Sequence, residues 1–355
     1  QAPARWDVPE LPEVGGPLIP TGWVAQAQQE CADLLGAERC WFGVNGASGL
    51  LQASLLAMAE PGSRVLLPRN LHRSLLHGCL LGNLEPVLFD LPFDTTTGLW
   101  LPPSAAHLER VIVAALATGP LAALVLVDPS YQGQVGDLQA LVAVGHRAGL
   151  TVLVDQAHGQ GEAVAAGADL VVVSCQKSGG GLAQSALVLQ QAKRVDPGAM
   201  ERALLWLQSS SPSALLLASA AASVRHSTSA RGQGQRRRAL TVARRLRQRC
   251  HHKQLPLVAN QDPLRLVLHT AAMGINGLDA DGWLMERGVI GELPEPGTLT
   301  FCLGMQPPAW LEWRLPRHLL ALRRALGGTP LPPFSAPPLP LVASPAMSLG
   351  QAWRS

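Results

Sequence analysis

Apolar residues occur in short continuous runs along the first half of the chain, and segments with a helical period separate them. Continuous apolar runs are typical of strands that are buried on both faces, because strands with one solvated face alternate between apolar and polar positions. Strands separated by helices predict an α/β fold with a mostly parallel sheet that is covered on both faces. The expected strands are residues 40–44, 64–67, 86–89, 121–127, 151–154 and 169–174, and the expected helices are 50–58, 72–81 and 137–148.

The second half of the chain predicts connecting helices followed by a smaller α/β domain. Residues 201–251 have a helical period that is interrupted by Ser-Ser-Ser-Pro at 209–212. The basic stretch 236–253 is interpreted as a solvated helix face rather than an anion-binding patch. In the small domain we expect strands at 256–259, 264–268 and 299–303 and helices at 278–287 and 311–326. The expected division is an extended N-terminal arm (1–22), a large domain (23–254), a small domain (255–329) and an irregular proline-rich tail (330–355).

Composition and charge exclude several classes of protein. The 355 residues are 47% apolar, and a net charge of +3 gives no reason to expect nucleic acid. The apolar segments fall short of the roughly 20 residues that a membrane helix needs, so no membrane span is expected. The six cysteines lack the spacing of a zinc site or a disulfide framework, which predicts no metal and a reducing cytoplasm. The chain opens on Gln1 without a secretory signal, and the missing initiator Met points to residues upstream.

Only three lysines, against 25 arginines, are available for a lysine-dependent chemistry. Lys177 follows the apolar run 169–174 and precedes three glycines, so we expect it at the carboxyl end of a buried strand. Burying an ammonium is costly unless it is paired or converted to a Schiff base, which favours a functional role for Lys177. Lys193 and Lys253 have polar or basic neighbours and are expected in solvent.

Three features upstream of Lys177 add to this chemistry. Asp155 ends the run 151–154, where an acid either meets a ligand or caps the next helix. The loop Asn45-Gly46-Ala47-Ser48-Gly49 leads into a helix, whose free N–H groups either bind a phosphate or are capped by the serine. His72 begins another helix and either stacks on a ring or caps that helix. Together the four features predict pyridoxal phosphate, which needs an imine lysine, an acid at the pyridine nitrogen, a phosphate cradle and a flat group on the ring.

The sequence resembles the major domain of the ornithine/lysine/arginine decarboxylases, from about Trp6 to Gly304. The resemblance depends on the order of several motifs and is specific as a set. The motifs are Asn45-Gly46, Arg69-Asn70-Leu71-His72-Arg73-Ser74-Leu75-Leu76-His77-Gly78, Asp128-Pro129-Ser130-Tyr131, Asp155-Gln156-Ala157-His158-Gly159, Gly167-Ala168-Asp169-Leu170-Val171, Ser174-Cys175-Gln176-Lys177 and Gln208-Ser209-Ser210-Ser211-Pro212-Ser213.

The resemblance implies a fold type I pyridoxal phosphate enzyme that works as a homodimer or larger homo-oligomer with shared active sites. It implies that Lys177 forms the imine with the cofactor, that Asp155 pairs with the pyridinium and that His72 stacks on the ring. The other residues that it implies at the cofactor are Ala47, Ser48, Gly49 and Ser174 at the phosphate, His158 beside the cofactor, and Ser210, whose segment 209–211 reaches the neighbouring subunit's site.

The reaction that the resemblance implies is decarboxylation of a basic amino acid (arginine, lysine or ornithine) to the corresponding amine and carbon dioxide. One alternative is another fold type I reaction, such as transamination or a different lyase step, because the same cofactor residues serve them all. A second alternative is a non-catalytic relative. It is motivated by Ala47, Gln156 and Gln176, which stand where family members usually have a hydroxyl residue, a glutamate and a histidine.

Overall fold

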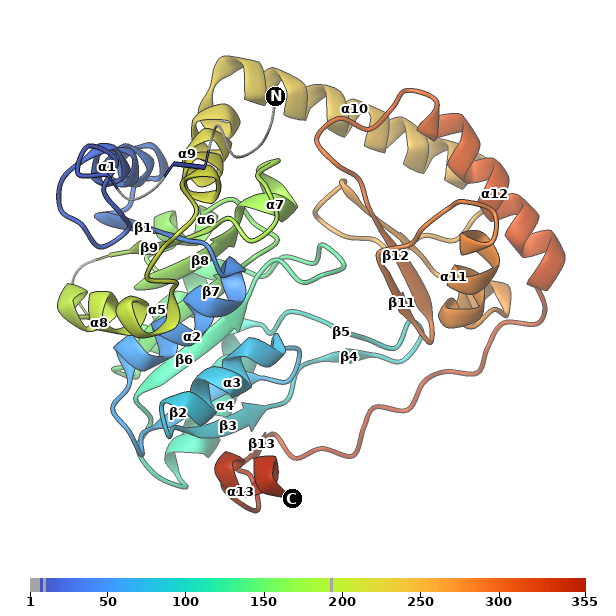
Figure 1. The fold of residues 1–355 in the computed structure, drawn as a ribbon. Helices are drawn as coiled ribbons and strands as arrows, with labels where there is room; N and C mark the ends of the chain where they lie inside the picture. The colour runs from blue at the N-terminus through green and yellow to red at the C-terminus, as the bar shows by residue number, and fades with distance from the viewer. Residues whose placement is uncertain (1–6, 9–10, 192–193) are drawn as a thin grey trace.

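The chain folds around one eight-stranded sheet, shown in Figure 1. The structure is a computed structural model that describes residues 7–8, 11–191 and 194–355. The strands of this sheet are β1 (Arg39–Gly43), β2 (Arg64–Pro68), β3 (Glu85–Phe89), β6 (Ala123–Val127), β7 (Thr151–Gln156), β8 (Leu170–Ser174), β9 (Ala186–Gln190) and β13 (Val342–Ala343). They lie in the order β1-β9-β8-β7-β6-β2-β3-β13, and the predicted α/β class is confirmed.

The direction of the strands brings five of their carboxyl ends to one edge of the sheet. Strands β8, β7, β6, β2 and β3 pair in parallel. The sequence did not predict β9, which pairs antiparallel with both β8 and β1, so β1 runs in the same direction as β8. Its antiparallel pairing depends on contacts with β8 and β1, which no local pattern of the chain encodes.

Alternate side chains of the central strands enter two separate apolar cores. In β7, Val152 and Val154 belong to one core and Leu153 to the other, as the two-residue period of a strand requires. The first core is covered by α1 (Trp23–Leu35), α4 (Ala105–Leu116), α5 (Leu138–Arg147), α6 (Glu162–Ala165) and α9 (Ala214–Thr228), and the second by α2 (Gly46–Met58), α3 (Arg73–Leu81) and α8 (Pro197–Leu207).

A three-stranded antiparallel sheet forms a third core with the helices that follow α9. The basic stretch lies in helix α10 (Ala230–His252). Its small residues Ala239 and Ala243 face this core, whereas Arg237 and Arg244 are exposed. The expected strand at 256–259 is reduced to an isolated bridge at Leu257. The elements are β10 (Arg265–Leu268), β12 (Thr298–Cys302), β11 (Leu293–Glu295), α10 (Ala230–His252), α11 (Gly277–Met285), α12 (Leu311–Leu326) and the 3-10 turn η2 (Ala271–Met273). A hairpin of β4 (Phe93–Asp94) and β5 (Leu99–Trp100) extends from the large sheet toward them (Figure 1).

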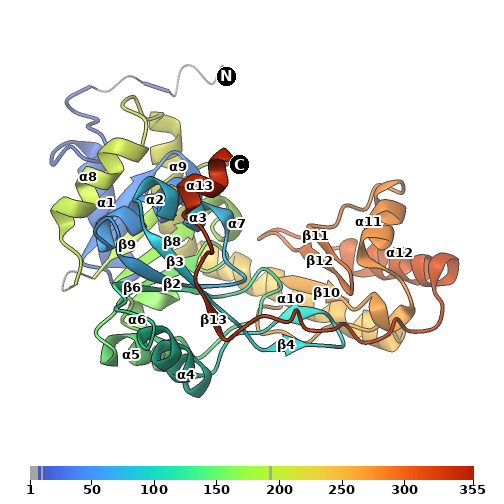
Figure 2. The same cartoon turned by 90° about the horizontal axis from the view of Figure 1, so that it is seen from below.

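The C-terminal tail, expected to be irregular, returns to the large sheet and becomes regular again there. After α12 it runs extended past the β4–β5 hairpin, where Phe334 N–H donates to the Thr95 carbonyl at 2.7 Å (Figure 2). It then adds β13 to the edge strand β3 and ends in α13 (Leu349–Arg354) beside α3. Ser348 and Gln351 form a capping box at the start of α13. The sequence did not predict these two elements, because β13 has two residues and α13 six, which is too few to show a repeated pattern of apolar and polar positions.

The N-terminal arm is only partly described. Residues 1–6 and 9–10 lie outside the described residues, and residues 11–22 form consecutive turns against α1 rather than an extended arm. Gln28 Nε2 in α1 donates to the Pro17 carbonyl at 3.1 Å, which fixes one of these turns. None of the described helices is both long enough and apolar enough to cross a membrane.

Ending the chain at Thr329 is expected to lower the free energy of unfolding by about 3 kcal/mol, at about 1 kcal/mol for each hydrogen bond lost. The lost bonds include those from Leu331 to Ala271, from Phe334 to Thr95 and from Asp90 to Leu341. Urea unfolding of the two proteins measures the difference. A chain that ends at Pro345 removes α13 but keeps these three bonds, and it should lose less; equal midpoints for all three proteins would contradict the prediction.

Candidate active site

A pocket of about 580 Å³ opens at the edge where the carboxyl ends of β1, β2, β6, β7 and β8 meet. Parallel sheets bind ligands at this edge, because the loops that leave the strands there face the same space. Strand β11 closes the pocket from the side of the small sheet, through Leu293 and Glu295. Its lining residues are Asn45, Gly46, Ala47, Ser48, Leu51, Asn70, Leu71, His72, Trp100, Val127, Ser130, Tyr131, Gln132, Asp155, Ala157, His158, Ser174, Gln176, Lys177, Gln184, Leu293 and Glu295.

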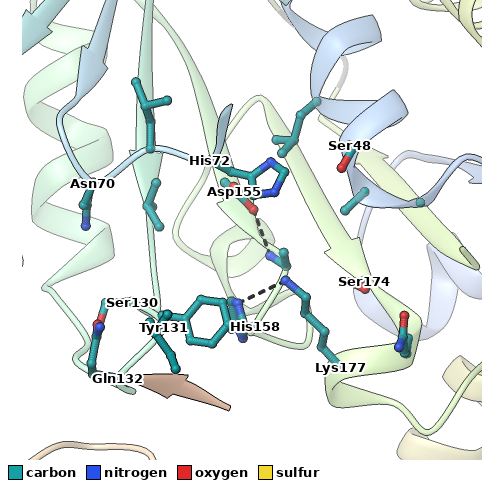
Figure 3. Close-up of a pocket in the computed structure, with 18 of the residues that line it drawn as sticks. Ser48, Asn70, His72, Ser130, Tyr131, Gln132, Asp155, His158, Ser174 and Lys177 are labelled. Atoms are coloured by element: carbon teal, nitrogen blue, oxygen red, sulfur yellow. Dashed lines mark hydrogen bonds between the residues drawn. The ribbon is translucent and has the colours of Figure 1, made fainter. Parts of the chain in front are cut away.

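Lys177 lies in α7 (Cys175–Ser178), a single turn that follows β8 directly. Its Nζ lies 3.1 Å from Nε2 of His158, and Figure 3 shows the two side chains pointing toward each other across the pocket. The turn is held in place by Gln160, whose Nε2 donates to the Ser178 carbonyl at 3.0 Å. The ring of Tyr131 packs against His158 with centroids 4.3 Å apart and lies 5.5 Å from Nζ.

Arg265 determines which nitrogen of His158 carries the proton. A guanidinium has donors only, so Arg265 Nη2 donates to His158 Nδ1 at 3.0 Å. Burial, followed by the positive charges of Lys177 and Arg265, lowers the pKa of His158 to about 2, so the imidazole is neutral near pH 7. A neutral imidazole has a single proton, which must then lie on Nε2 and point at Lys177.

This tautomer favours the free amine of Lys177 over its ammonium form, whose charge is one of the causes that lower the pKa of His158. With the proton of His158 on Nε2, this N–H points at Nζ, and only the amine has a lone pair with which to accept it. Burial is the main cause that lowers the pKa of Lys177, and the negative charges of Asp155 and Glu292 oppose this change. A free lysine amine in a pocket is a nucleophile, which is the form that condenses with an aldehyde.

Asp155 lies at the end of β7 on the face that α2 covers, and it is 4% exposed. Its Oδ1 accepts the Ala157 N–H at 3.0 Å, while Oδ2 has no hydrogen-bond partner among the described residues. Burial raises the pKa of Asp155, and the charge of Lys177 only partly offsets this rise. A cationic ring nitrogen would supply the missing partner for Oδ2.

The start of α2 forms the opposite end of the pocket. The helix begins at Gly46, four residues before the expected start, so Ala47 and Ser48 belong to its first turn. The N-cap residue Asn45 makes no capping bond with its side chain, which instead donates to the Leu207 carbonyl at 2.8 Å. The first-turn N–H groups and the hydroxyls of Ser48 and Ser174 therefore face the pocket, and they suit a phosphate.

His72 caps α3, which is one of the two roles that the sequence left open, and it also lines the pocket. Its Nδ1 accepts the Ser74 N–H at 3.3 Å and lies 2.8 Å from the Ser74 hydroxyl. The nearby side-chain carbonyl of Asn70, Oδ1, is buried without a donor among the described residues. A buried acceptor without a donor is costly, and a ligand in the pocket would satisfy it.

The structure brings together seven of the nine candidate residues and leaves Gly49 and Ser210 outside the lining. Gly49 is buried in α2, where a Cβ would lie 3.0 Å from Gln208 Nε2. A residue without a side chain therefore allows Gln208 to pack closely against the helix. Ser210 is exposed in the turn after α8. The seven that line the pocket are Ala47, Ser48, His72, Asp155, His158, Ser174 and Lys177.

Sequence reasoning missed Arg265 and Glu295 and assigned no role to Gln132. Arg265 could have been suspected, because a charge inside the apolar strand 264–268 must find a partner when it is buried. Gln132 and Glu295 carry no comparable signal, since the turn and the strand that hold them meet only in the folded chain. The departure at Gln156 lies outside the pocket lining, and its Oε1 accepts the Ala163 N–H at 3.0 Å.

The fold is that of the fold type I pyridoxal phosphate-dependent enzymes. Lysine decarboxylase A from Pseudomonas aeruginosa superposes with a TM-score of 0.75 and 18% identity, over 90% of this chain and 53% of that chain. Serine palmitoyltransferase from Sphingomonas wittichii superposes with a TM-score of 0.66 and 21% identity, over 87% of this chain and 78% of that chain. Two enzymes of different chemistry thus share this arrangement of strands and helices.

Residues 4–267 match the model of the Orn/Lys/Arg decarboxylase major domain, and the chain belongs to this family. It is 28% identical to an arginine decarboxylase of Bacillus subtilis over 287 residues, which is 75% of this chain and 58% of that protein. An arginine decarboxylase of Halalkalibacterium halodurans is 29% identical over 76% of this chain and 58% of its own length. The chain therefore spans just over half the length of these curated relatives. The resemblance found in the sequence is confirmed.

Replacing Arg265 with methionine is expected to raise the pKa of Lys177, because a positive charge is removed and His158 Nε2 becomes free to accept a hydrogen bond from an ammonium. Acylation of Lys177 followed by mass spectrometry across pH 6–10, on protein without added cofactor, measures the midpoint. Arg265→Lys keeps a cationic donor and serves as the control. The same midpoint in wild type and Arg265→Met would contradict the proton arrangement.

Proposed function

We propose that this protein is a pyridoxal phosphate-dependent decarboxylase of a basic amino acid, with arginine, lysine and ornithine as the candidate substrates. The single observation that carries the proposal is Lys177 Nζ, held against His158 in a pocket that also presents a buried acid and a free helix start. The chain's membership of the Orn/Lys/Arg decarboxylase family gives the reaction class. The arginine decarboxylase names of two relatives favour a basic substrate.

Each end of the pocket has a chemical task in this proposal. When bound, pyridoxal phosphate supplies an aldehyde that condenses with amines and a cationic ring that accepts the electron pair left by departing carbon dioxide. Asp155 would meet the ring nitrogen through Oδ2 and keep it protonated, since a charge-assisted hydrogen bond is roughly twice as strong as a neutral one. The first turn of α2, with Ser48 and Ser174, would hold the phosphate.

Lys177 and His158 handle protons in the same proposal. Lys177 Nζ would be the amine that holds the cofactor through its aldehyde, and it would be able to carry a proton whenever it is free of the cofactor. His158 keeps its own proton on Nε2, where Arg265 fixes it, and this N–H remains in the pocket as a donor after Lys177 moves. His72 and Tyr131 are side chains of the pocket wall that limit the access of water to this proton.

We also propose that the protein works as a homo-oligomer in the cytoplasm. The C-terminal part of α8 exposes Leu205 and Trp206, which are 68% and 79% exposed, next to the serine turn that includes Ser210. Exposed aromatic side chains of this size are typical of protein interfaces. A neighbouring subunit on this face would bring Ser210 near an active site. All six cysteines are free thiols, which is consistent with a reducing compartment.

Lys177→Ala is expected to abolish the visible absorbance band that the protein gains when pyridoxal phosphate is added, because Nζ is the amine that condenses with it. Borohydride reduction and peptide mass spectrometry should locate the cofactor on Lys177 in the wild type. Lys253→Ala, which changes an exposed lysine, should keep the band. A Lys177→Ala protein that retains the band would refute this assignment.

Asp155→Asn is expected to lower the turnover of the preferred basic amino acid by about a hundredfold, because an amide cannot hold the ring nitrogen in its cationic form. Product analysis with arginine, lysine and ornithine, cofactor present, measures the effect. Asp279→Asn changes an exposed acid of α11 and should have wild-type turnover. A keto acid in place of amine and carbon dioxide would indicate transamination, and no product from any of the three would indicate a non-catalytic relative.

A further inference from the structure

The tip of the β4–β5 hairpin touches the small sheet beside the candidate active site. Figure 1 shows the hairpin reaching the ends of β11 and β12 that are joined by the turn at residues 296–297. The two backbones lie so close together that a Cβ added to Gly297 would be 2.2 Å from the Thr97 carbonyl oxygen. A side chain at position 297 would therefore separate the hairpin from the turn.

The ring of Phe334, in the C-terminal tail, packs against both partners of this contact. A Cβ added to Gly297 would lie 2.7 Å from Phe334 Cε2, and one added to Gly98 would lie 3.2 Å from the same ring. The Phe334 N–H donates to the Thr95 carbonyl at 2.7 Å, and Figure 2 shows the tail running beside β4. Phe334 thus contacts the hairpin through its backbone and its side chain, and the turn through its side chain.

The hairpin and the turn both continue directly into the wall of the pocket. Trp100 lies two residues after Gly98, and Glu295 lies two residues before Gly297. Trp100 and Glu295 line the pocket. The Phe93 ring packs edge-on against Trp100 with centroids 5.0 Å apart, which joins the two strands of the hairpin. A displacement of the hairpin relative to the turn would therefore change the width of the pocket.

The tail is held on both sides of Phe334. Before it, the Leu331 N–H donates to the Ala271 carbonyl at 2.9 Å, and after it the Leu341 carbonyl accepts the Asp90 N–H at 2.9 Å. Two prolines, at 332 and 333, precede Phe334 directly, and the proline ring restricts the backbone of each. Because the tail has little conformational freedom left to lose, it can present the Phe334 ring at a small cost in entropy.

Other contacts between the two sheets are hydrogen bonds at other places. Gln132 Nε2 donates to Glu295 Oε2 at 2.7 Å, and His269 Nε2 lies 3.0 Å from the Thr96 carbonyl oxygen. Phe334 adds apolar packing at the hairpin tip, where a half-buried aromatic ring excludes water from the contact. Loss of this ring is therefore expected to loosen the hairpin without releasing the small sheet.

We propose that Phe334 is a positioning residue for the pocket, because its ring keeps the β4–β5 hairpin against the turn 296–297 and so fixes Trp100 relative to β11. Phe334 does not itself line the pocket, so it acts through these two elements. The inference goes beyond the proposed function, since it assigns part of the shape of the pocket to the C-terminal tail. Its consequence for substrate binding rests on that function.

Hydrogen exchange of the wild type and of Phe334→Ala, both without cofactor, tests the packing role independently of activity. The substitution removes the ring but keeps the backbone bond to Thr95. We expect exchange of the segments 93–101 and 296–300 to become at least about tenfold faster, because their local opening no longer breaks the packing of the ring. Strands β7 and β8 should exchange at the wild-type rate.

Steady-state kinetics measure what the position of the hairpin does for the substrate. We expect Phe334→Ala to raise KM for the preferred basic amino acid about tenfold and to change kcat less than about twofold. The affinity for pyridoxal phosphate, from an absorbance titration, should stay that of the wild type, because the groups proposed to hold it lie at the ends of β1, β7 and β8.

Two matched variants complete the experiment. Phe334→Leu keeps a large apolar side chain and should recover most of the loss in KM. Leu339→Ala removes a 36% exposed apolar side chain from the same tail and should behave as the wild type in exchange and in kinetics.

Equal exchange of the two segments in the wild type and in Phe334→Ala overturns the inference, whatever the activity. Exchange that is faster by the same factor in β7 and β8 also overturns it, because Phe334 would then stabilise the whole fold rather than position the hairpin. A local change in exchange with a wild-type KM overturns the role in substrate binding. If the wild type decarboxylates no basic amino acid, the proposed function fails, and the exchange pattern still decides whether Phe334 positions the pocket wall.

Discussion

The site depends on the hydrogen bond between His158 and Lys177. A single proton lies between His158 Nε2 and Lys177 Nζ in this bond. Arg265 donates to His158 Nδ1, which places the imidazole proton on Nε2 and favours the free amine of Lys177. The protonation of this lysine thus depends in part on an arginine that does not line the pocket. Arg265 comes from β10, so the chemistry of the large sheet requires the small sheet to be in place.

Sheet direction explains why these groups meet at all. Five strands that run the same way deliver the starts of their following loops to one edge, and the antiparallel β9 lets β1 join them without a crossover of its own. The α2 start at Gly46, His72, Asp155 and Lys177 are separated by up to 131 positions in the chain, yet all line one pocket. The tail reinforces the arrangement, because it spans from α12 to the far edge at β3 and bonds to elements of both sheets on the way.

The departures from the usual family residues have different consequences in the structure. Gln156 serves the backbone of α6 through Ala163 and does not line the pocket, so a neutral amide performs its task. Ala47 adds no hydroxyl to the pocket, but the N–H groups of the first turn of α2 and the hydroxyl of Ser48 remain. Gln176 lines the pocket and is exposed beside Lys177. Of the three departures, it is the one whose side chain adjoins the reactive lysine.

The sequence by itself determined the α/β class, most strands of the large sheet and the family, because apolar runs and contiguous motifs are local properties of the chain. It also singled out Lys177 and Asp155, since each follows a buried strand directly. Only the tertiary structure decided the antiparallel β9, the return of the tail, and the places of Arg265, Gln132 and Glu295 around the pocket. These depend on pairings between segments up to 255 positions apart, as between Leu88 and Ala343, and no local periodicity encodes such a contact.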